Sequence, residues 1–172
     1  MDRRERIIAR IYALLVTLPG VGVAADGTPA VYRDRGEVPE GVKPAVIFLD
    51  GRGRLRTPVN RTNVQIMPPS IQSLNPQIFV LLEMRDNVLT NEQLSGQPAP
   101  VGPELSGWRN NVLALITQDD TLGALVGANG QISFDGETTD METGSSMGVK
   151  GAELRFDFTL TYPLDPAQLN SP

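Results

Sequence analysis

The chain contains neither cysteine nor histidine among its 172 residues. The absence of cysteine excludes a disulfide framework, and the two absences together exclude metal sites built from thiolate or imidazole ligands. Mechanisms that pair a serine or cysteine nucleophile with histidine are excluded as well. Any catalysis would therefore depend on carboxylates, lysine, tyrosine or a metal ion held by oxygen ligands.

Aromatic residues and lysine are scarce. Aromatic residues make up 5% of the chain, so leucine, valine and isoleucine must supply most of a core. Lysine occurs only at Lys43 and Lys150, and the remaining cations are arginines, which favour bidentate carboxylate pairs and protein interfaces. A formal net charge of -5 argues against general affinity for nucleic acid, because phosphate binding depends on clustered Lys and Arg.

Long apolar runs are also missing. A membrane-spanning helix needs roughly 20 apolar residues, and the N-terminal apolar run is interrupted by Arg and Glu without the cleavage site of a signal peptide. We therefore expect a soluble protein, made in the cytoplasm, that contacts no membrane. The length and the 40% hydrophobic content favour a single domain over residues 1–163, followed by a loosely ordered tail over residues 164–172.

The N-terminal segment predicts an amphipathic helix that begins near Arg3. Its apolar residues follow helical spacing at Ile7, Ile8, Ile11, Leu14, Leu15 and Leu18. Asp2 is a candidate N-cap. Pro19-Gly20 marks the end, because proline disfavours helical conformation in the residue before it and glycine tolerates the backbone conformation of a helix end.

Short strands and two further helices come after this helix. We expect strands at residues 30–35, 44–50, 62–67, 77–84, 131–135 and 152–162, because these segments are apolar or alternate polar and apolar residues. Asp50-Gly51 predicts a hairpin tip, and residues 95–103, rich in Pro and Gly, predict an extended loop. The second helix buries Trp108 on its apolar face, and the segment after Asp119-Asp120 is either a short third helix or a continuation of the second helix after a kink. This order predicts an α+β fold, with a mixed, mostly antiparallel sheet packed against the N-terminal helix and the second, central helix.

Three segments could carry chemistry, but each is better explained by structure. Gly20-Val21-Gly22 lacks the preceding strand and following helix of a dinucleotide site, so a turn is favoured. Asp50, Glu83 and Asp86 could act in acid-base or Mg²⁺ chemistry, although nothing in their spacing selects it. The acidic run at residues 135–142 lacks the spacing of an EF-hand and is interpreted as a solvated hairpin.

Four arginines stand close together without a balancing acid, at Arg52, Arg54, Arg56 and Arg61. They could be charges that protect an exposed hairpin from edge-to-edge aggregation. Alternatively, they could form an arm that grips an acidic partner or nearby nucleic acid. The residues leave both interpretations open, and they are the candidate partner-contact site.

The order of segments resembles the tail-terminator and related minor tail proteins of long-tailed bacteriophages and phage-derived particles. The resembling segments are residues 7–20, 32–35, 44–51, 67–68, 77–82, 108–112, 120–122, 127–130 and 158–162. They cover most of the chain, but no single residue is diagnostic. The arginine segment and the Pro-rich residues 95–103 depart from the family pattern.

The resemblance implies a structural subunit of the virion and no enzymatic activity, cofactor or metal. Such a subunit forms a ring, typically hexameric, that caps the tail tube and joins it to the head connector. Its partners would be copies of itself, the tail tube protein and a connector or neck protein, while DNA passes through the ring without specific binding. The alternatives are a neck or head-completion protein of the same particle, a carboxylate-metal hydrolase using Asp50, Glu83 and Asp86, or a regulatory binding module using the arginines.

Overall fold

The computed structural model describes residues 2–36, 38, 42, 44–56, 71–83, 101–144 and 148–163. This part of the chain contains helices α1 (Arg3–Val16), α3 (Val101–Thr117) and α4 (Asp120–Val126). It also contains strands β1 (Val31–Arg33), β2 (Ala45–Leu49), β3 (Gly53–Arg56), β4 (Ile71–Leu74), β5 (Gln77–Glu83), β6 (Gln131–Gly144) and β7 (Gly148–Pro163). The expected strand at residues 62–67 and the tail at residues 164–172 lie outside the described residues.

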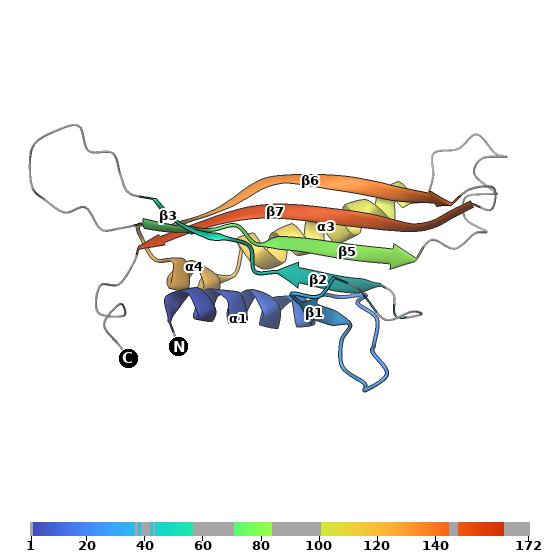
Figure 1. Cartoon of the computed structure of the whole chain (residues 1–172), viewed down its shortest axis with the longest axis horizontal. Coiled ribbons are helices and arrows are strands. Elements are labelled where there is room, and N and C mark those ends of the chain that lie inside the picture. Colours follow the sequence, from blue (N-terminus) through green and yellow to red (C-terminus); the bar gives the residue numbers. More distant parts are fainter. Residues whose placement is uncertain are drawn as a thin grey trace, which may run out of the picture.

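All the strands belong to one sheet, with β7 as its long central member (Figure 1). One side of β7 pairs with β6, and the other side pairs first with β5 and then with β4. Farther from β7, β2 pairs with β5 and β1 pairs with β2, while β3 pairs with β4. Only the β1–β2 pairing is parallel among the described strands. The predicted α+β class with a mixed, mostly antiparallel sheet is therefore confirmed.

The predicted hairpin tip at Asp50-Gly51 is wrong. β2 and β3 do not pair with each other; they follow one another across the kink at residues 50–52 and pair with β5 and β4 respectively. The facing strand breaks at the same level, at Asn75-Pro76. Gly51 has a φ of 72°, and a Cβ there would lie 1.7 Å from the carbonyl oxygen of Asn75. Glycine is required at this position because the two kinked backbones approach so closely.

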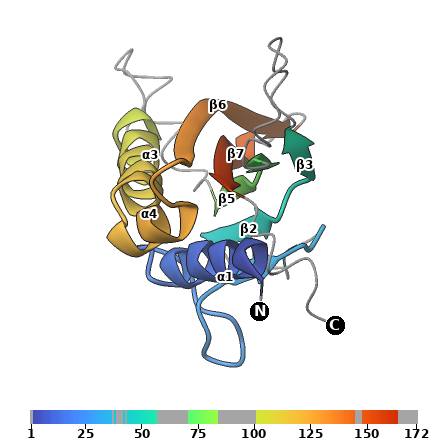
Figure 2. The ribbon, with the colours of Figure 1, turned by 90° about the vertical axis from the view of Figure 1, so that its left-hand side faces the viewer.

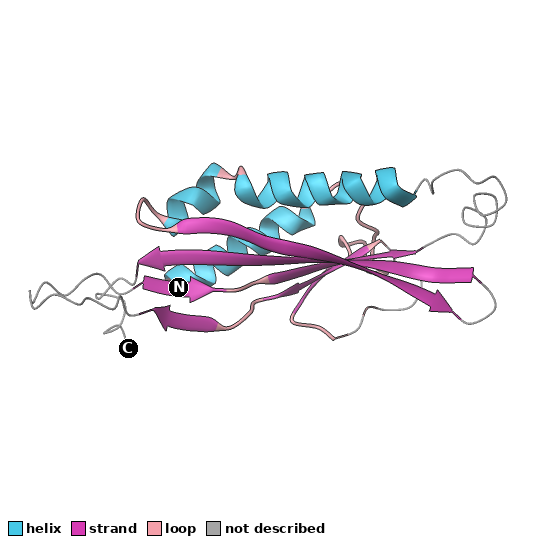
Figure 3. Ribbon diagram, turned by 90° about the horizontal axis from the view of Figure 1, so that it is seen from above, coloured by secondary structure: helices cyan, strands magenta, loops and turns pink. Residues whose placement is uncertain are grey.

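The described helices cover one face of the sheet, and none of them lies on the other face, which is called the open face (Figure 3). Seen along the strands, the sheet curves around α1, α3 and α4 (Figure 2). α1 buries the predicted stripe of Ile7, Ile8, Ile11, Leu14 and Leu15, and Asp2 caps it by accepting a 2.7 Å hydrogen bond from the backbone N–H of Glu5. The predicted helix, its N-cap and its end before Pro19-Gly20 are confirmed. No helix in the described ranges is long and apolar enough to cross a membrane.

The second helix begins earlier than expected. α3 starts at Val101, so the predicted loop at residues 95–103 is wrong over its last three residues, and residues 95–100 lie outside the described part. Pro103 is tolerated because the first turn of a helix needs no N–H donor there. Trp108, Val112 and Ile116 are buried, which confirms the predicted core role of Trp108. Its ring packs against Gly20, where a Cβ would lie 3.2 Å from it.

The last two strands are longer than predicted. β6 continues through residues 135–142, so the acidic run is part of a strand and is not a solvated hairpin. A bulge between Phe134 and Gly136 re-registers the strand, and pairing with β7 continues to Gly144. A bulge lets one strand absorb an extra residue without ending the ladder. The prediction of a turn at Asp135-Gly136 fails because a bulge and a turn favour the same residues.

β7 shows the predicted alternation. Leu154, Phe156, Phe158, Leu160 and Tyr162 are all at most 3% exposed and face the helices, while the intervening residues are partly exposed on the other face. The buried residues of helices and strands form one cluster. The covered face of the sheet is therefore the core, and within the described residues the surfaces left for a partner are the open face, the edges and the outer sides of the helices.

Candidate interaction surfaces

The open face of the sheet carries a connected polar network on β7 and its neighbours. Asn75 donates a 2.6 Å hydrogen bond from Nδ2 to the Thr159 hydroxyl, which in turn donates to Asp135. Asp157 accepts bonds from Gln77 Nε2 at 2.7 Å and from the guanidinium of its strand neighbour Arg155. The bonds from Asn75 and Gln77 attach the break between β4 and β5 to the central strand β7 on the open face.

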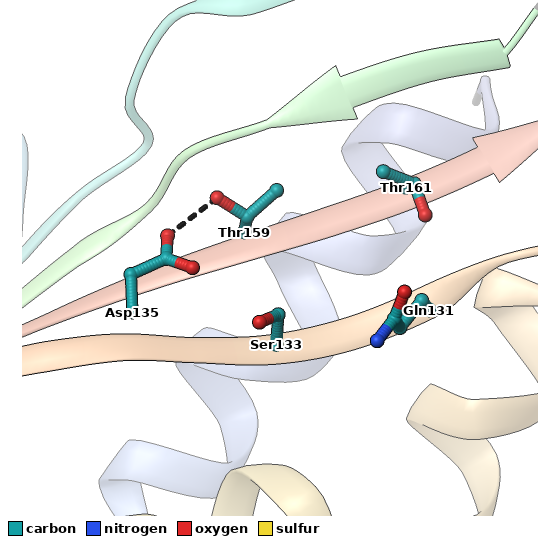
Figure 4. A pocket seen from close by; sticks show the side chains of 5 residues that line it. All are labelled: Gln131, Ser133, Asp135, Thr159 and Thr161. Carbon is teal, nitrogen blue, oxygen red and sulfur yellow. Dashed lines mark hydrogen bonds between the residues drawn. The ribbon is translucent and has the colours of Figure 1, made fainter.

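A shallow hollow lies on this face along β6 and β7, with a volume of about 230 Å³. Its lining is entirely polar and consists of Gln131, Ser133, Asp135, Thr159 and Thr161 (Figure 4). The hydroxyls and the single carboxylate can exchange hydrogen bonds with a polar surface. Among these groups, the Asp135 carboxylate accepts a hydrogen bond from the Thr159 hydroxyl. The hollow therefore offers a polar partner both hydrogen-bond donors and acceptors.

Asp50 and Glu83, two members of the candidate carboxylate set, lie far apart. Asp50 follows the end of β2 that pairs with Gln77, whereas Glu83 ends β5 six residues further on, roughly 20 Å away along the strand. Asp86 lies outside the described residues. Within the described residues, no group of three or more Asp or Glu side chains is arranged to hold a metal ion.

Asp50 instead belongs to an ion-pair cluster centred on Arg33, which no sequence pattern predicted. The Arg33 guanidinium binds both oxygens of Asp50, at 2.8 and 2.6 Å, and both oxygens of Glu5 on α1, at 2.8 and 3.2 Å. The hydrogen bonds that Arg33 donates, first to Asp50 and then to Glu5, raise the pKa of Arg33. This cluster joins the edge of the sheet to α1, so Asp50 has a structural role.

A second ion pair holds the helices together. Arg10 on α1 donates to both oxygens of Asp119, at 3.0 and 2.6 Å, and Asp119 also accepts from the backbone N–H of Leu122 as the N-cap of α4. The hydrogen bond from Arg10 lowers the pKa of Asp119. One carboxylate therefore caps α4 and anchors it to α1.

The Gly20-Val21-Gly22 motif lies in a turn between α1 and β1 and does not connect a strand to a helix. Gly20 has a φ of 87° in the turn after α1, and Gly22 donates to the carbonyl of Pro44 and accepts from Ala30. No helix of the described chain separates them from β1. The predicted turn is therefore confirmed.

The arginine segment is placed at one edge of the sheet. Arg52 lies exposed in the kink, while Arg54 and Arg56 are part of β3, opposite Ser73 and Ile71 of β4. Arg61 lies outside the described residues. The segment over residues 53–56 is therefore a sheet edge and not an exposed hairpin tip. The alternating spacing of the three arginines was a signal for this strand.

The sheet has unlike edges. β6 pairs only with β7 on one side, and no strand of the described residues pairs with its outer edge. The opposite side of the sheet ends in β1 over one half and β3 over the other. The outer edges differ in charge, because β3 contains arginines and the outer half of β6 contains carboxylates.

No family model and no curated protein matches this chain. Its function must therefore be inferred from the geometry of its faces and edges.

Proposed function

We propose that the chain is a structural virion subunit, a tail terminator that assembles as a ring, caps the tail tube and joins it to the head connector. The observation that supports this proposal is the sheet itself, which has one face covered by helices, an open polar face and two unlike edges. A ring subunit needs two different surfaces that meet head to tail, and unlike edges provide such a pair.

The open face suits the channel side of such a ring. Its residues on β7 are Arg155, Asp157, Thr159 and Thr161, a mixture of both charges with neutral hydroxyls. A surface of this kind lacks the clustered cations that give proteins tight affinity for phosphate, so DNA would pass without being held. The resemblance to tail-terminator proteins gives the proposal its specific form.

The proposal is tested by mixing the purified protein with tail tubes of its particle and imaging the tube ends by negative stain. Rings that cap the tube ends and stop further tube growth are the expected result. Binding to portal-proximal rings instead of tube ends would identify a neck or head-completion protein. A protein that leaves both structures bare would contradict the assembly role.

A further inference from the structure

β3 and β6 each pair with only one other strand of the described residues, and these two edge strands carry complementary three-residue sequences. β3 contains Arg54-Leu55-Arg56, and the outer half of β6 contains Asp140-Met141-Glu142. Each has an apolar residue between two charges of one sign, and the two signs are opposite. We propose that these segments pair between two copies of the chain, as antiparallel strands with Leu55 opposite Met141. This inference rests on the proposed function, because the pairing would be the head-to-tail contact between neighbouring subunits of the ring.

The two segments cannot meet within one molecule. Arg54 pairs with Ser73, which pairs with Thr161, whereas Glu142 pairs with Gly151. Thr161 and Gly151 are ten residues apart along β7, which at about 3.3 Å per residue is roughly 33 Å. Figure 1 shows β3 near one end of the molecule and the β6–β7 hairpin extending to the other. Contact between them therefore needs a second copy.

Strand directions agree with antiparallel pairing. β3 is antiparallel to β4, β4 is antiparallel to β7, and β7 is antiparallel to β6. β3 and β6 thus run in opposite directions. A neighbouring copy in the same orientation brings its β6 beside β3 as an antiparallel strand, and the sheet continues across the contact.

The charges select this pairing over self-pairing. Opposite charges directly across a strand pair are stabilising and like charges are destabilising, so two β3 edges repel one another. In the proposed register Arg54 lies opposite Glu142 and Arg56 opposite Asp140. Within its own molecule Asp140 lies opposite Glu153 of β7, a like-charge pair. In the proposed contact, an arginine of the neighbouring copy's β3 would offset that repulsion. Arg54 and Arg56 in turn have no acidic residue opposite them on β4, so the neighbouring β6 would supply their opposite charges.

Cysteine cross-linking tests the register, because the chain has no cysteine of its own. A variant with Leu55→Cys and Met141→Cys is expected to form disulfide-linked dimers and higher species on mild oxidation. A bridge within one molecule is impossible, because a disulfide requires Cα atoms less than about 7 Å apart. The matched control combines Leu55→Cys with Ser106→Cys, an exposed residue on α3, and should stay monomeric. Cross-linking of Leu55→Cys alone would overturn the proposal in favour of β3 self-pairing.

Charge reversal tests the chemistry. The protein is expected to associate at low salt, and either R54E/R56E or D140K/E142K should make it monomeric in sedimentation velocity. A one-to-one mixture of the two variants should recover association, because each carries the edge that the other has lost. Added salt should weaken every association, since ions screen charges over about 8–10 Å. A monomeric wild type, or charge-reversed variants that associate as the wild type does, would overturn the proposal.

Folding and function are separated by two further readouts. Thermal unfolding by circular dichroism should show that the charge variants keep the wild-type transition, so that loss of association is not loss of fold. If the Leu55→Cys/Met141→Cys variant forms cross-linked oligomers that do not cap tail tubes, the proposed contact is supported and the terminator function is refuted. Capped tubes without the Leu55–Met141 cross-link would retain the function and refute the contact.

Discussion

The two faces of β7 differ in how they are held. On the covered face Leu154, Phe156, Phe158, Leu160 and Tyr162 pack against the helices and are almost inaccessible. On the open face the intervening residues are joined by hydrogen bonds from Asn75 and Gln77 and remain partly exposed. One face depends on removing apolar surface from water and the other on polar groups that water also reaches. Substitutions should therefore have large effects on the covered face and small effects on the open face.

Phe156→Ala should have the largest effect. Phe156 is fully buried, and removing a buried aromatic ring leaves a cavity that typically costs about 3–5 kcal/mol in the free energy of unfolding. Thr161→Ala, on the same strand but the other face, should cost less than about 1 kcal/mol. Urea unfolding followed by circular dichroism measures both. Equal losses for the two variants would show that the faces do not differ as described.

Gly51→Ala tests the kink where the two halves of the sheet meet. Its Cβ would overlap the Asn75 carbonyl at 1.7 Å with a φ of 72°, so strain and overpacking should together cost about 2–4 kcal/mol. Gly27 has a similar φ of 81° but nothing within 4 Å, so Gly27→Ala should cost only about 1–2 kcal/mol. The difference between the urea midpoints of the two variants measures the cost of the clash with the Asn75 carbonyl, separately from the cost of the positive φ. If the two variants unfold together, the backbones do not approach so closely.

Most of the order of elements could be predicted because it depends on local patterns, but β3 and β4 were not expected as strands. The spacing of Ile7, Ile8 and Ile11 and the alternation along β7 each reflect one covered face. The kink at Gly51 could not, because Asp50-Gly51 is equally suited to a hairpin turn, and only the pairing of β2 with β5 and of β3 with β4 decides between them. Turn residues show that the chain changes direction, but strand pairing decides whether that change is a hairpin or a kink.

The candidate surfaces were predicted only in part, for the same reason. The arginine cluster was visible in the sequence, since Arg52, Arg54 and Arg56 stand close together. The role of Asp50 was not visible, because its partner Arg33 lies 17 residues away in the sequence and also binds Glu5, which is brought near only by the packing of α1 against the sheet edge. Charge patterns within a strand are local information, and ion pairs between elements are not.

Asp119→Asn should have an intermediate effect that depends on pH. The variant weakens both the α4 cap and the pair with Arg10, so a loss of about 1–2 kcal/mol is expected at neutral pH. The pKa of Asp119 is lowered in the folded state, so its contribution is complete above the ordinary aspartate pKa of about 3.9 and disappears as the pH falls through the folded value. The difference between wild type and variant should therefore shrink in acid.

Urea titrations at neutral pH and at several acidic values measure this difference. Arg10→Leu separates the ion pair from the cap, because it removes the cationic partner of Asp119 and keeps the carboxylate that caps α4. Its difference from wild type should also narrow in acid, from a smaller starting value. A difference that stays constant down to the lowest pH would contradict the ion pair as its source.

Tyr162→Phe should have the smallest effect and sharpens the contrast between the two faces. The Tyr162 hydroxyl is buried and has no hydrogen-bond partner among the described residues, and burial raises its pKa. Because a buried unsatisfied polar group costs free energy, its removal should leave stability unchanged or raise it by up to about 1 kcal/mol. Tyr12 donates from its hydroxyl to the carbonyl of Val31 at 3.2 Å, so Tyr12→Phe should lose about 0.5–1.5 kcal/mol. Urea unfolding of each variant and of the wild type gives the change in unfolding free energy, and its sign shows whether the hydroxyl is stabilising. A loss on Tyr162→Phe as large as that on Tyr12→Phe would mean that the hydroxyl is satisfied, and that the covered face contains a polar contact where the packing shows only apolar ones.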